Sequence, residues 1–336
     1  MLENGVQPDA LVLRTELPLN MDIRKKVAQF CNVDLGSVIE SKDVDTIYEV
    51  PLLMKEEKLD LTILRKLALG TKSEPNLDRW TTFVNKLKNP KTQIRVGLVG
   101  KYVELPDSYK SIQESFIHAG AENECKVEVT TIHSEDITSD NVNETMKDLH
   151  GILIAPGFGQ RGIEGKIIAA KYARENNLPF LGVCLGMQCS VIEFARNVLG
   201  YKEADSTEFN RRTPDPVIDL MEEQKNITEK GGTMRLGSYP CEIKKNSNVH
   251  EIYNVSQIRE RHRHRYEFNN AYLKDFERAG MIATGINPET DLVEIVEIPE
   301  HRWFVGVQFH PEYKSTVLQP HPLFVAFVKE MCRQNP

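Results

Sequence analysis

Two short strings, far apart in the chain, contain the residue types of a thiol-based active site. GVCLG at 182–186 follows one apolar run, and QFHPE at 308–312 follows another. A cysteine nucleophile, a histidine base and a carboxylate that orients the histidine are the three parts of a thiol hydrolase. The sequence therefore indicates Cys184, His310 and Glu312 as a catalytic triad.

The glycines around Cys184 are typical of a nucleophile on a sharp strand-to-helix turn. Such a turn is strained and crowded, so it needs small neighbours, which Gly182 and Gly186 provide. Residues 187–195 predict a helix whose N-terminus points at the sulfur and favours a thiolate. The same turn would put the Leu185 N–H where an oxyanion forms.

Each string alone also has an ordinary interpretation. A cysteine after a buried strand is often only a small core residue, and His310 with Glu312 could be a surface pair. Their spacing of two places both side chains on one side of an extended segment, where the carboxylate can hold the imidazole tautomer. Both strings end predicted buried strands, and ligand sites of open parallel sheets collect at the carboxyl ends of strands.

The elements that would carry these residues alternate between strand and helix from residue 94 onward. Alternation of this kind predicts an α/β fold with a doubly wound, mostly parallel sheet. The later strands would extend that sheet near the C-terminus. A helix capped by Asp107 or Ser108 and a helix through 167–172 join the strands. The predicted strands are 94–100, 127–132, 151–155, 179–183, 231–237, 292–296 and 303–309.

The first part of the chain has a different character. A strand at 10–14, a helix at 22–30 and further elements over 43–51 and 59–69 are too little to close a core. We therefore expect residues 1–70 to be the C-terminal part of a domain whose body lies elsewhere. Residues 71–93 are interpreted as a linker and 94–336 as the main domain.

Composition narrows the class of protein. The chain has 336 residues, 42 Lys and Arg against 49 Asp and Glu, and a net charge of −7, so no nucleic-acid partner is expected. The beginning has no signal-peptide pattern, and no apolar run is long enough to cross a membrane. The 6 cysteines form no Cys-x-x-Cys and fit reduced thiols. We expect a cytoplasmic protein with no membrane partner.

A glycine pattern at 157, 159 and 162 imitates a dinucleotide-binding fingerprint. That fingerprint needs an acidic residue at the end of the next strand, but that strand ends at Cys184. We prefer a loop that presents the Gly157 N–H as a second oxyanion donor, although a simple tight turn is also compatible.

The string RHRHRYE at 261–267 first suggests a metal or phosphate site. Two histidines without a third ligand nearby are a weak metal signal, and a basic run is usually a solvated face. The preferred interpretation is an arginine that grips a substrate carboxylate. Glu208 could pair with a substrate ammonium, or be an ordinary exposed glutamate. No metal ligand is assigned.

The motifs together resemble the class I (triad) glutamine amidotransferases, and among these the cytidine triphosphate (CTP) synthases. The resemblance covers nearly the whole chain. It rests on GVCLGMQ, FHPE and the further strings GLVGKY at 97–102, DSYKS at 107–111, GGTMRLG at 231–237, RHRHRYE at 261–267, FCNV at 30–33 and SKDVD at 41–45.

The resemblance implies glutamine hydrolysis by Cys184 with His310 as base and then acid, and Glu312 as its orienter. It implies that Gly157 and Leu185 stabilise the oxyanion and that Phe158 lies near the mouth of an ammonia path. The implied glutamine-binding positions are Gly186, Met187, Gln188, Glu208 and Arg265.

The resemblance also implies chemistry for a longer protein. Ammonia would pass to a synthetase domain that uses ATP and Mg²⁺ to aminate UTP to CTP, with GTP as activator, CTP as inhibitor and a homo-tetrameric assembly. Lys26, Lys42, Asp43 and Val44 match positions at the family's pyrimidine-nucleotide site. Most of that domain is expected to be missing, so the chain could not make CTP alone; glutamine hydrolysis itself implies no cofactor.

One departure from the family pattern concerns the oxyanion loop. Many members have PGGFG, whereas this chain has APGFG at 155–159, so Pro156 precedes Gly157 and has no N–H to donate. We expect Gly157 to be the donor. Two alternatives stay open, a γ-glutamyl hydrolase on the same fold and a non-catalytic regulatory or assembly module.

Overall fold

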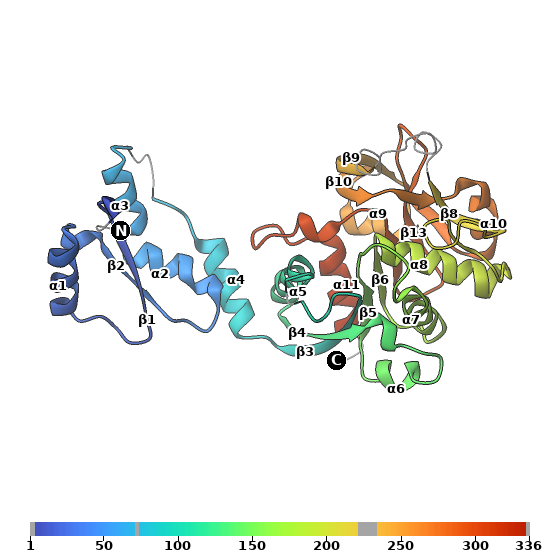
Figure 1. The fold of residues 1–336 in the computed structure, drawn as a ribbon, viewed down its shortest axis with the longest axis horizontal. Helices are drawn as coiled ribbons and strands as arrows, with labels where there is room; N and C mark the ends of the chain where they lie inside the picture. Colours follow the sequence, from blue (N-terminus) through green and yellow to red (C-terminus); the bar gives the residue numbers. More distant parts are fainter. Residues whose placement is uncertain (1–3, 71–73, 106, 221–233, 334–336) are drawn as a thin grey trace. The chain divides into compact units, whose positions relative to one another are not determined.

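A computed structural model describes residues 4–70, 74–105, 107–220 and 234–333. The chain divides into two compact units, Met1–Asn85 and Lys86–Pro336, which are drawn along one ribbon in Figure 1 and are described separately here. The expected boundaries at residues 70 and 93 stay predictions. Within the described residues, no helix combines the length and apolarity needed to cross a membrane.

The first unit is a small α/β assembly around two parallel strands. Asn20 caps its first helix by accepting the Ile23 N–H at 2.9 Å, and Arg24 of that helix bonds Glu40 at 2.6 Å and Glu57 at 2.7 Å. These bonds tie three elements together. The elements are β1 (Leu11–Thr15), α1 (Met21–Cys31), β2 (Val38–Lys42), α2 (Val50–Glu56), α3 (Leu59–Lys66) and the start of α4 (Asp78–Lys88).

Little apolar surface is buried in this unit. Tyr48 packs edge-on against Phe83 at 5.0 Å, whereas Leu17 and Phe30 are 77% and 85% exposed. Apolar side chains of this unit are thus left uncovered, and its expected place at the end of a larger domain stays a prediction. The strand β2 was not predicted, and residues 43–51 hold a short 3-10 helix at Ile47–Glu49 before α2 begins.

The second unit contains the predicted doubly wound sheet. Its parallel strands lie in the spatial order β4, β3, β5, β6 and β14, which is the flavodoxin-like order 2-1-3-4-5. The predicted fold class is therefore confirmed. The bounds are β3 (Thr92–Gly100), β4 (Cys125–His133), β5 (Gly151–Ile154), β6 (Phe180–Val183) and β14 (Phe304–Val307).

Helices cover both faces of this sheet, as Figure 1 shows. Helices α7 (Ile163–Glu175) and α8 (Leu185–Phe194) bury one apolar face, and α5 (Lys110–Glu122) and α11 (Pro322–Cys332) bury the other. The buried runs of the parallel strands explain this arrangement, because a strand apolar on both sides needs cover on both sides.

The C-terminal strands extend the sheet in antiparallel fashion beyond β14. Within the described residues the full sheet has 9 strands, and a separate one of 3 strands lies beside it. Part of the strand predicted at 231–237 lies outside the described residues. The bounds are β13 (Val293–Glu297), β12 (Ile282–Ile286), β9 (Arg235–Ile243) and β10 (Gln257–His264), then β11 (Tyr266–Phe268), β8 (Pro216–Leu220) and β7 (Asp205–Ser206).

The predicted cap of α5 is wrong. The helix begins after Tyr109, and neither Asp107 nor Ser108 caps it. The Tyr109 ring is buried, and its hydroxyl accepts the Lys101 N–H at 2.9 Å and the Tyr102 N–H at 3.3 Å. This tertiary contact fixes where the helix starts and overrides the local capping preference.

Candidate active site

Cys184 lies on a strained turn between β6 and α8. Its φ of 53° and ψ of −104° are unusual for a residue with a side chain. The Cys184 N–H donates to the Val307 carbonyl at 2.7 Å, which ties the turn to the end of β14. The turn therefore presents the thiol at the carboxyl edge of the parallel sheet, beside the string that contains His310.

Steric crowding explains why glycine occupies positions 182 and 186 of this turn. A Cβ on Gly182 would lie 2.8 Å from the carbonyl carbon of Gly186. A Cβ on Gly186 would collide with the Ile154 carbonyl of β5. Both positions need glycine because backbone packs directly against them.

The His310 ring faces Glu312, and its charged form is favoured. The Nδ1 atom lies 2.8 Å from Glu312 Oε1, and both residues are buried. Burial opposes the positive charge, but Cys184 and Glu312 outweigh it and raise the pKa of His310 to about 11. Among the described residues, Nε2 has no hydrogen-bond partner within ideal geometry. After burial, Cys184 is the largest influence on the pKa of this ring, through its charge and a hydrogen bond.

The two residues predicted to donate to an oxyanion, Gly157 and Leu185, are neighbours in space. A Cβ on Gly157 would lie 3.4 Å from Leu185 Cδ2, so the loop after β5 passes directly over the turn. The Leu185 N–H is in the first turn of α8, where backbone donors have no acceptor within the helix. The positive end of the α8 dipole also favours negative charge near this N–H group.

Two buried lysines hold the loop after β5 that is predicted to supply an oxyanion donor. Lys166 is fully buried and donates to the Ala155 carbonyl at 2.5 Å. Lys101 is 2% exposed and donates to the Phe158 carbonyl at 3.0 Å and to the Gly159 carbonyl. Burial lowers the pKa of Lys166 to about 8 and also lowers that of Lys101. Sequence reasoning missed both residues, since an isolated lysine gives no sign of burial.

A pocket of about 180 Å³ opens above Cys184. Glu208 accepts the Gly159 N–H at 2.8 Å, and burial raises the pKa of this carboxyl. An acidic and a basic side chain thus share one small pocket, which suits an amino acid. The lining includes Gly157, Phe158, Cys184, Gln188, Glu208 and Arg265.

The other predicted pocket residues differ in what they present. Gln188 donates through Nε2 to the Tyr266 carbonyl at 2.9 Å, so its amide is already engaged. Met187 packs against Gly306 of β14, so only its backbone could face a ligand. Phe158 is 46% exposed at the edge of the pocket.

The predicted nucleotide-site residues lie in the first unit, not in this pocket. Lys26 is on the exposed face of α1, and Lys42 ends β2. Asp43 follows that strand and pairs with Arg14 at 2.7 Å, with Val44 next in the chain.

Comparison with known proteins assigns both parts of the chain. Residues 104–330 match the family model for glutamine amidotransferase class-I, and residues 1–69 match the model for the CTP synthase N-terminus. The chain belongs to the CTP synthase family of class-I glutamine amidotransferases.

Relatives in this family match over nearly the whole chain. A CTP synthase of Cytophaga hutchinsonii is 64% identical over 97% of this chain and 61% of its own length. One of Christiangramia forsetii is 61% identical over 98% of this chain and 60% of its own length. The chain thus spans about three fifths of these relatives.

A solved structure supports the fold of the second unit. The glutaminase domain of Trypanosoma brucei CTPS with bound acivicin is 37% identical, with a TM-score of 0.67, over 71% of this chain and 94% of that one. The predicted family is confirmed; the roles of individual site residues stay predictions.

Proposed function

We propose that this chain hydrolyses glutamine as the glutaminase part of a CTP synthase. The observation that carries the proposal is the buried His310–Glu312 pair beside Cys184, at the carboxyl ends of β6 and β14. A raised imidazole pKa next to a cysteine supports a thiolate–imidazolium pair, which is the reactive form of such a nucleophile.

The first half of the reaction forms a thioester. The Cys184 sulfur attacks the side-chain amide carbon of glutamine, and negative charge develops on the carbonyl oxygen. The N–H groups of Gly157 and Leu185 stabilise that charge. When the C–N bond breaks, His310 gives its proton to the leaving nitrogen and ammonia departs.

The second half restores the enzyme. His310, now neutral, takes a proton from a water molecule that attacks the thioester carbon. The C–S bond breaks, glutamate leaves and the proton on His310 again pairs with the Cys184 thiolate. Glu312 holds the imidazole in the orientation that both steps require.

The ends of the pocket suggest how glutamine is held. Arg265 would bind its α-carboxylate and Glu208 its ammonium group, with Gln188 also near these backbone groups, and Gly186 and Met187 would face the substrate through their own backbone. Phe158, at the edge of the pocket, would border the path that ammonia takes.

The remaining roles concern the longer protein. We propose that residues 1–70 belong to its synthetase domain, that 71–93 link the two parts and that 94–336 form the glutaminase. Lys26, Lys42, Asp43 and Val44 would be the remnant of its UTP and CTP site. Use of ATP and Mg²⁺, activation by GTP and a tetrameric assembly belong to that longer protein. Within the described residues no cluster of 3 or more His, Cys, Asp or Glu could hold a metal, so none is assigned here.

Ammonia release from glutamine tests the proposal, both with the chain alone and with GTP and the remaining synthetase part supplied. We expect Cys184→Ala to abolish release and the control Cys332→Ala, at a half-exposed thiol on α11, to leave it unchanged. Ammonia release that persists in Cys184→Ala would exclude Cys184 as the nucleophile. Preference for γ-glutamyl peptides would indicate the hydrolase alternative. A Cys184 no more reactive toward alkylation than buried Cys241 would indicate a non-catalytic module.

A further inference from the structure

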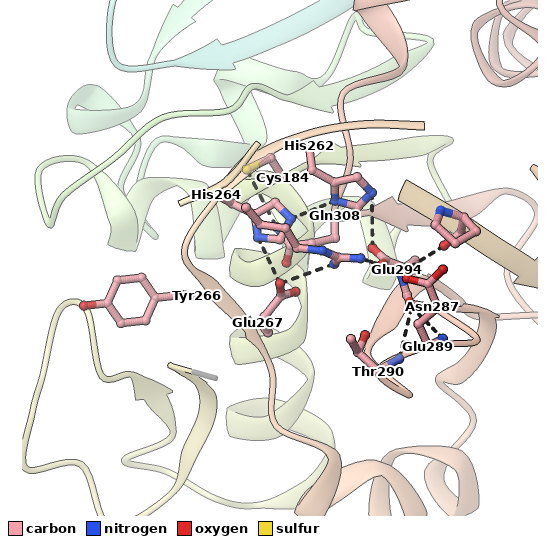
Figure 2. A network of polar contacts seen from close by, with 12 residues as sticks. Cys184, His262, His264, Tyr266, Glu267, Asn287, Glu289, Thr290, Glu294 and Gln308 are labelled. Atoms are coloured by element: carbon pink, nitrogen blue, oxygen red, sulfur yellow. Dashed lines mark hydrogen bonds and ion pairs between the residues drawn. The ribbon is translucent and has the colours of Figure 1, made fainter. Parts of the chain in front are cut away.

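Next to the pocket lies a closed set of five buried ionisable residues to which the reaction described above gives no role; one of them, His264, also lines the pocket. We call it the polar ring; it consists of Arg235, His262, His264, Glu267 and Glu294. Each member is between 0% and 6% exposed. Figure 2 labels His262, His264, Glu267 and Glu294 of this ring, beside Cys184 and Gln308. Charged groups are costly to bury, so a set of this size needs a specific reason.

The members contact one another around the ring. His262 Nδ1 lies 2.8 Å from His264 Nε2, and His264 Nδ1 lies 3.3 Å from Glu267 Oε1. Arg235 bridges the two carboxylates, at 3.4 Å from Glu267 and 2.7 Å from Glu294. His262 Nε2 lies 3.6 Å from Glu294 Oε2, which closes the circuit.

Burial shifts the pKa values of the ring members toward their neutral forms. Burial, together with the positive charges of Arg235 and His310, lowers the pKa of His264 far below its ordinary value. Burial raises the pKa of Glu267 well above its usual range and that of Glu294 to about 7. Burial thus favours the neutral form of His264 and opposes two simultaneous negative charges on Glu267 and Glu294 beside the single Arg235 cation.

Two members of the ring, His264 and Glu267, flank the bend that contains Arg265. His264 ends β10, which pairs with β9, and Tyr266 begins β11, which pairs with β8 in a different sheet. The His264–Glu267 contact therefore closes the bend from below. Figure 2 shows Tyr266 directed away from the ring and Glu267 lying against it.

The ring is also connected to the segment after β14 that contains Gln308 and His310. The Gln308 N–H donates to the Glu294 carbonyl at 2.9 Å, and Gln308 Nε2 lies 3.7 Å from Cys184 Sγ. The His310 N–H donates to the Arg261 carbonyl of β10 at 2.8 Å. Two of these links are backbone hydrogen bonds and one is the Gln308 side chain, whereas the links to the Arg265 bend run through ring side chains.

We propose that the polar ring is a positioning device for glutamine, which holds the Arg265 bend so that the guanidinium meets the substrate's α-carboxylate. This inference rests on the proposed glutaminase function. Replacing a ring side chain should loosen the bend and leave the Cys184 turn in place, because β6, α8 and the backbone links fix that turn. Binding of the amino acid should weaken, while the intrinsic reactivity of the thiol should not change.

The test uses the full chain with His264→Gln, and with Glu294→Gln as a second variant of nearly unchanged shape. His301→Gln is the matched control, since His301 is also a buried histidine, bonded to the Ala173 carbonyl at 3.0 Å outside the ring. Labelling of Cys184 is followed by mass spectrometry with two reagents, a chloroketone analogue of glutamine and iodoacetamide. The KM and kcat for glutamine are measured in parallel.

Loss of a charge-assisted contact to the carboxylate corresponds to about a tenfold weaker interaction. We therefore expect ring variants to be labelled about tenfold more slowly by the glutamine analogue, with iodoacetamide labelling and kcat nearly unchanged and KM raised. His301→Gln should alter none of these. If His264→Gln does not fold, Glu294→Gln decides the outcome alone.

The inference would be overturned if the rate of labelling by the glutamine analogue, relative to that by iodoacetamide, were equal in wild type and ring variants. It would also be overturned if His301→Gln slowed labelling by the analogue as much as the ring variants do. A loss of iodoacetamide labelling equal to that of the analogue would also overturn it, because the ring would then support the thiol and not the substrate. If the wild-type chain itself shows no preference for the glutamine analogue, the proposed function fails, and that result is distinct from failure of the ring.

Discussion

His310 Nδ1 and Glu312 Oε1 lie 2.8 Å apart at the end of β14, and both side chains are buried. The carboxylate therefore determines which ring nitrogen carries a fixed proton and leaves Nε2 for the proposed acid–base role. This relationship sets the first prediction.

Replacing Glu312 by glutamine should lower kcat for glutamine hydrolysis by about 100-fold, since an imidazole without its orienting carboxylate loses much of its acid–base contribution. KM should change little, because Glu312 does not line the glutamine pocket. The measurement is steady-state ammonia release. Glu144→Gln, at an exposed surface pair with Lys147, is the control. Unaltered kcat in Glu312→Gln would contradict the triad.

Removing the cysteine sulfur should lower the pKa of His310. Cys184 and Glu312 raise this pKa to about 11, so the wild-type ring should stay protonated across the neutral range. In Cys184→Ala it should titrate at a lower pH, as followed by NMR of the imidazole protons, while Cys189→Ala should not shift it. Wild-type titration near about pH 6.5 would contradict the ion pair.

The raised pKa of His310 also determines how the free energy of unfolding changes with pH. A cation whose pKa is raised by folding stabilises the folded state below its unfolded pKa, and this contribution is lost as pH rises through the folded pKa of about 11. Wild type should therefore lose more stability than Cys184→Ala between neutral and strongly alkaline pH. Thermal unfolding at several pH values measures the difference.

Lys101→Met should reduce kcat by about tenfold through a misaligned oxyanion loop, since small displacements of a donor weaken transition-state binding steeply. The Lys101 ammonium binds the carbonyls of the adjacent loop residues Phe158 and Gly159. Lys171→Met, on the surface of α7, is the control. Wild-type turnover by Lys101→Met would exclude a positioning role for this lysine.

Lys166 should make the fold more stable as pH rises above neutrality. Folding lowers its pKa to about 8, so between that value and its ordinary one the unfolded chain binds more protons than the folded chain. Stability should rise by about 2 kcal/mol between about pH 7.5 and 9.5 from this group. Lys166→Met should lack that rise in urea unfolding, and an identical pH slope in both proteins would contradict it.

The sequence by itself determined the parts of this protein that local patterns specify. The turn at Cys184 needs glycine at 182 and 186 because backbone packs against both, so the GVCLG string carries its own geometry. The spacing of His310 and Glu312 likewise brings the pair together on one short segment. Buried apolar runs predicted the strands of the parallel sheet, and the motifs predicted the family.

Only the tertiary structure decided which distant residues support that site. The histidines of RHRHRYE share one face of β10, a strand periodicity visible in the sequence, but Arg235 and Glu294 meet them only because β9 and β13 belong to the same sheet. Lys101 and Lys166 became loop supports in the same way. Burial and pairing of a charged side chain arise from contacts across the fold. They therefore cannot be predicted from the residue type alone.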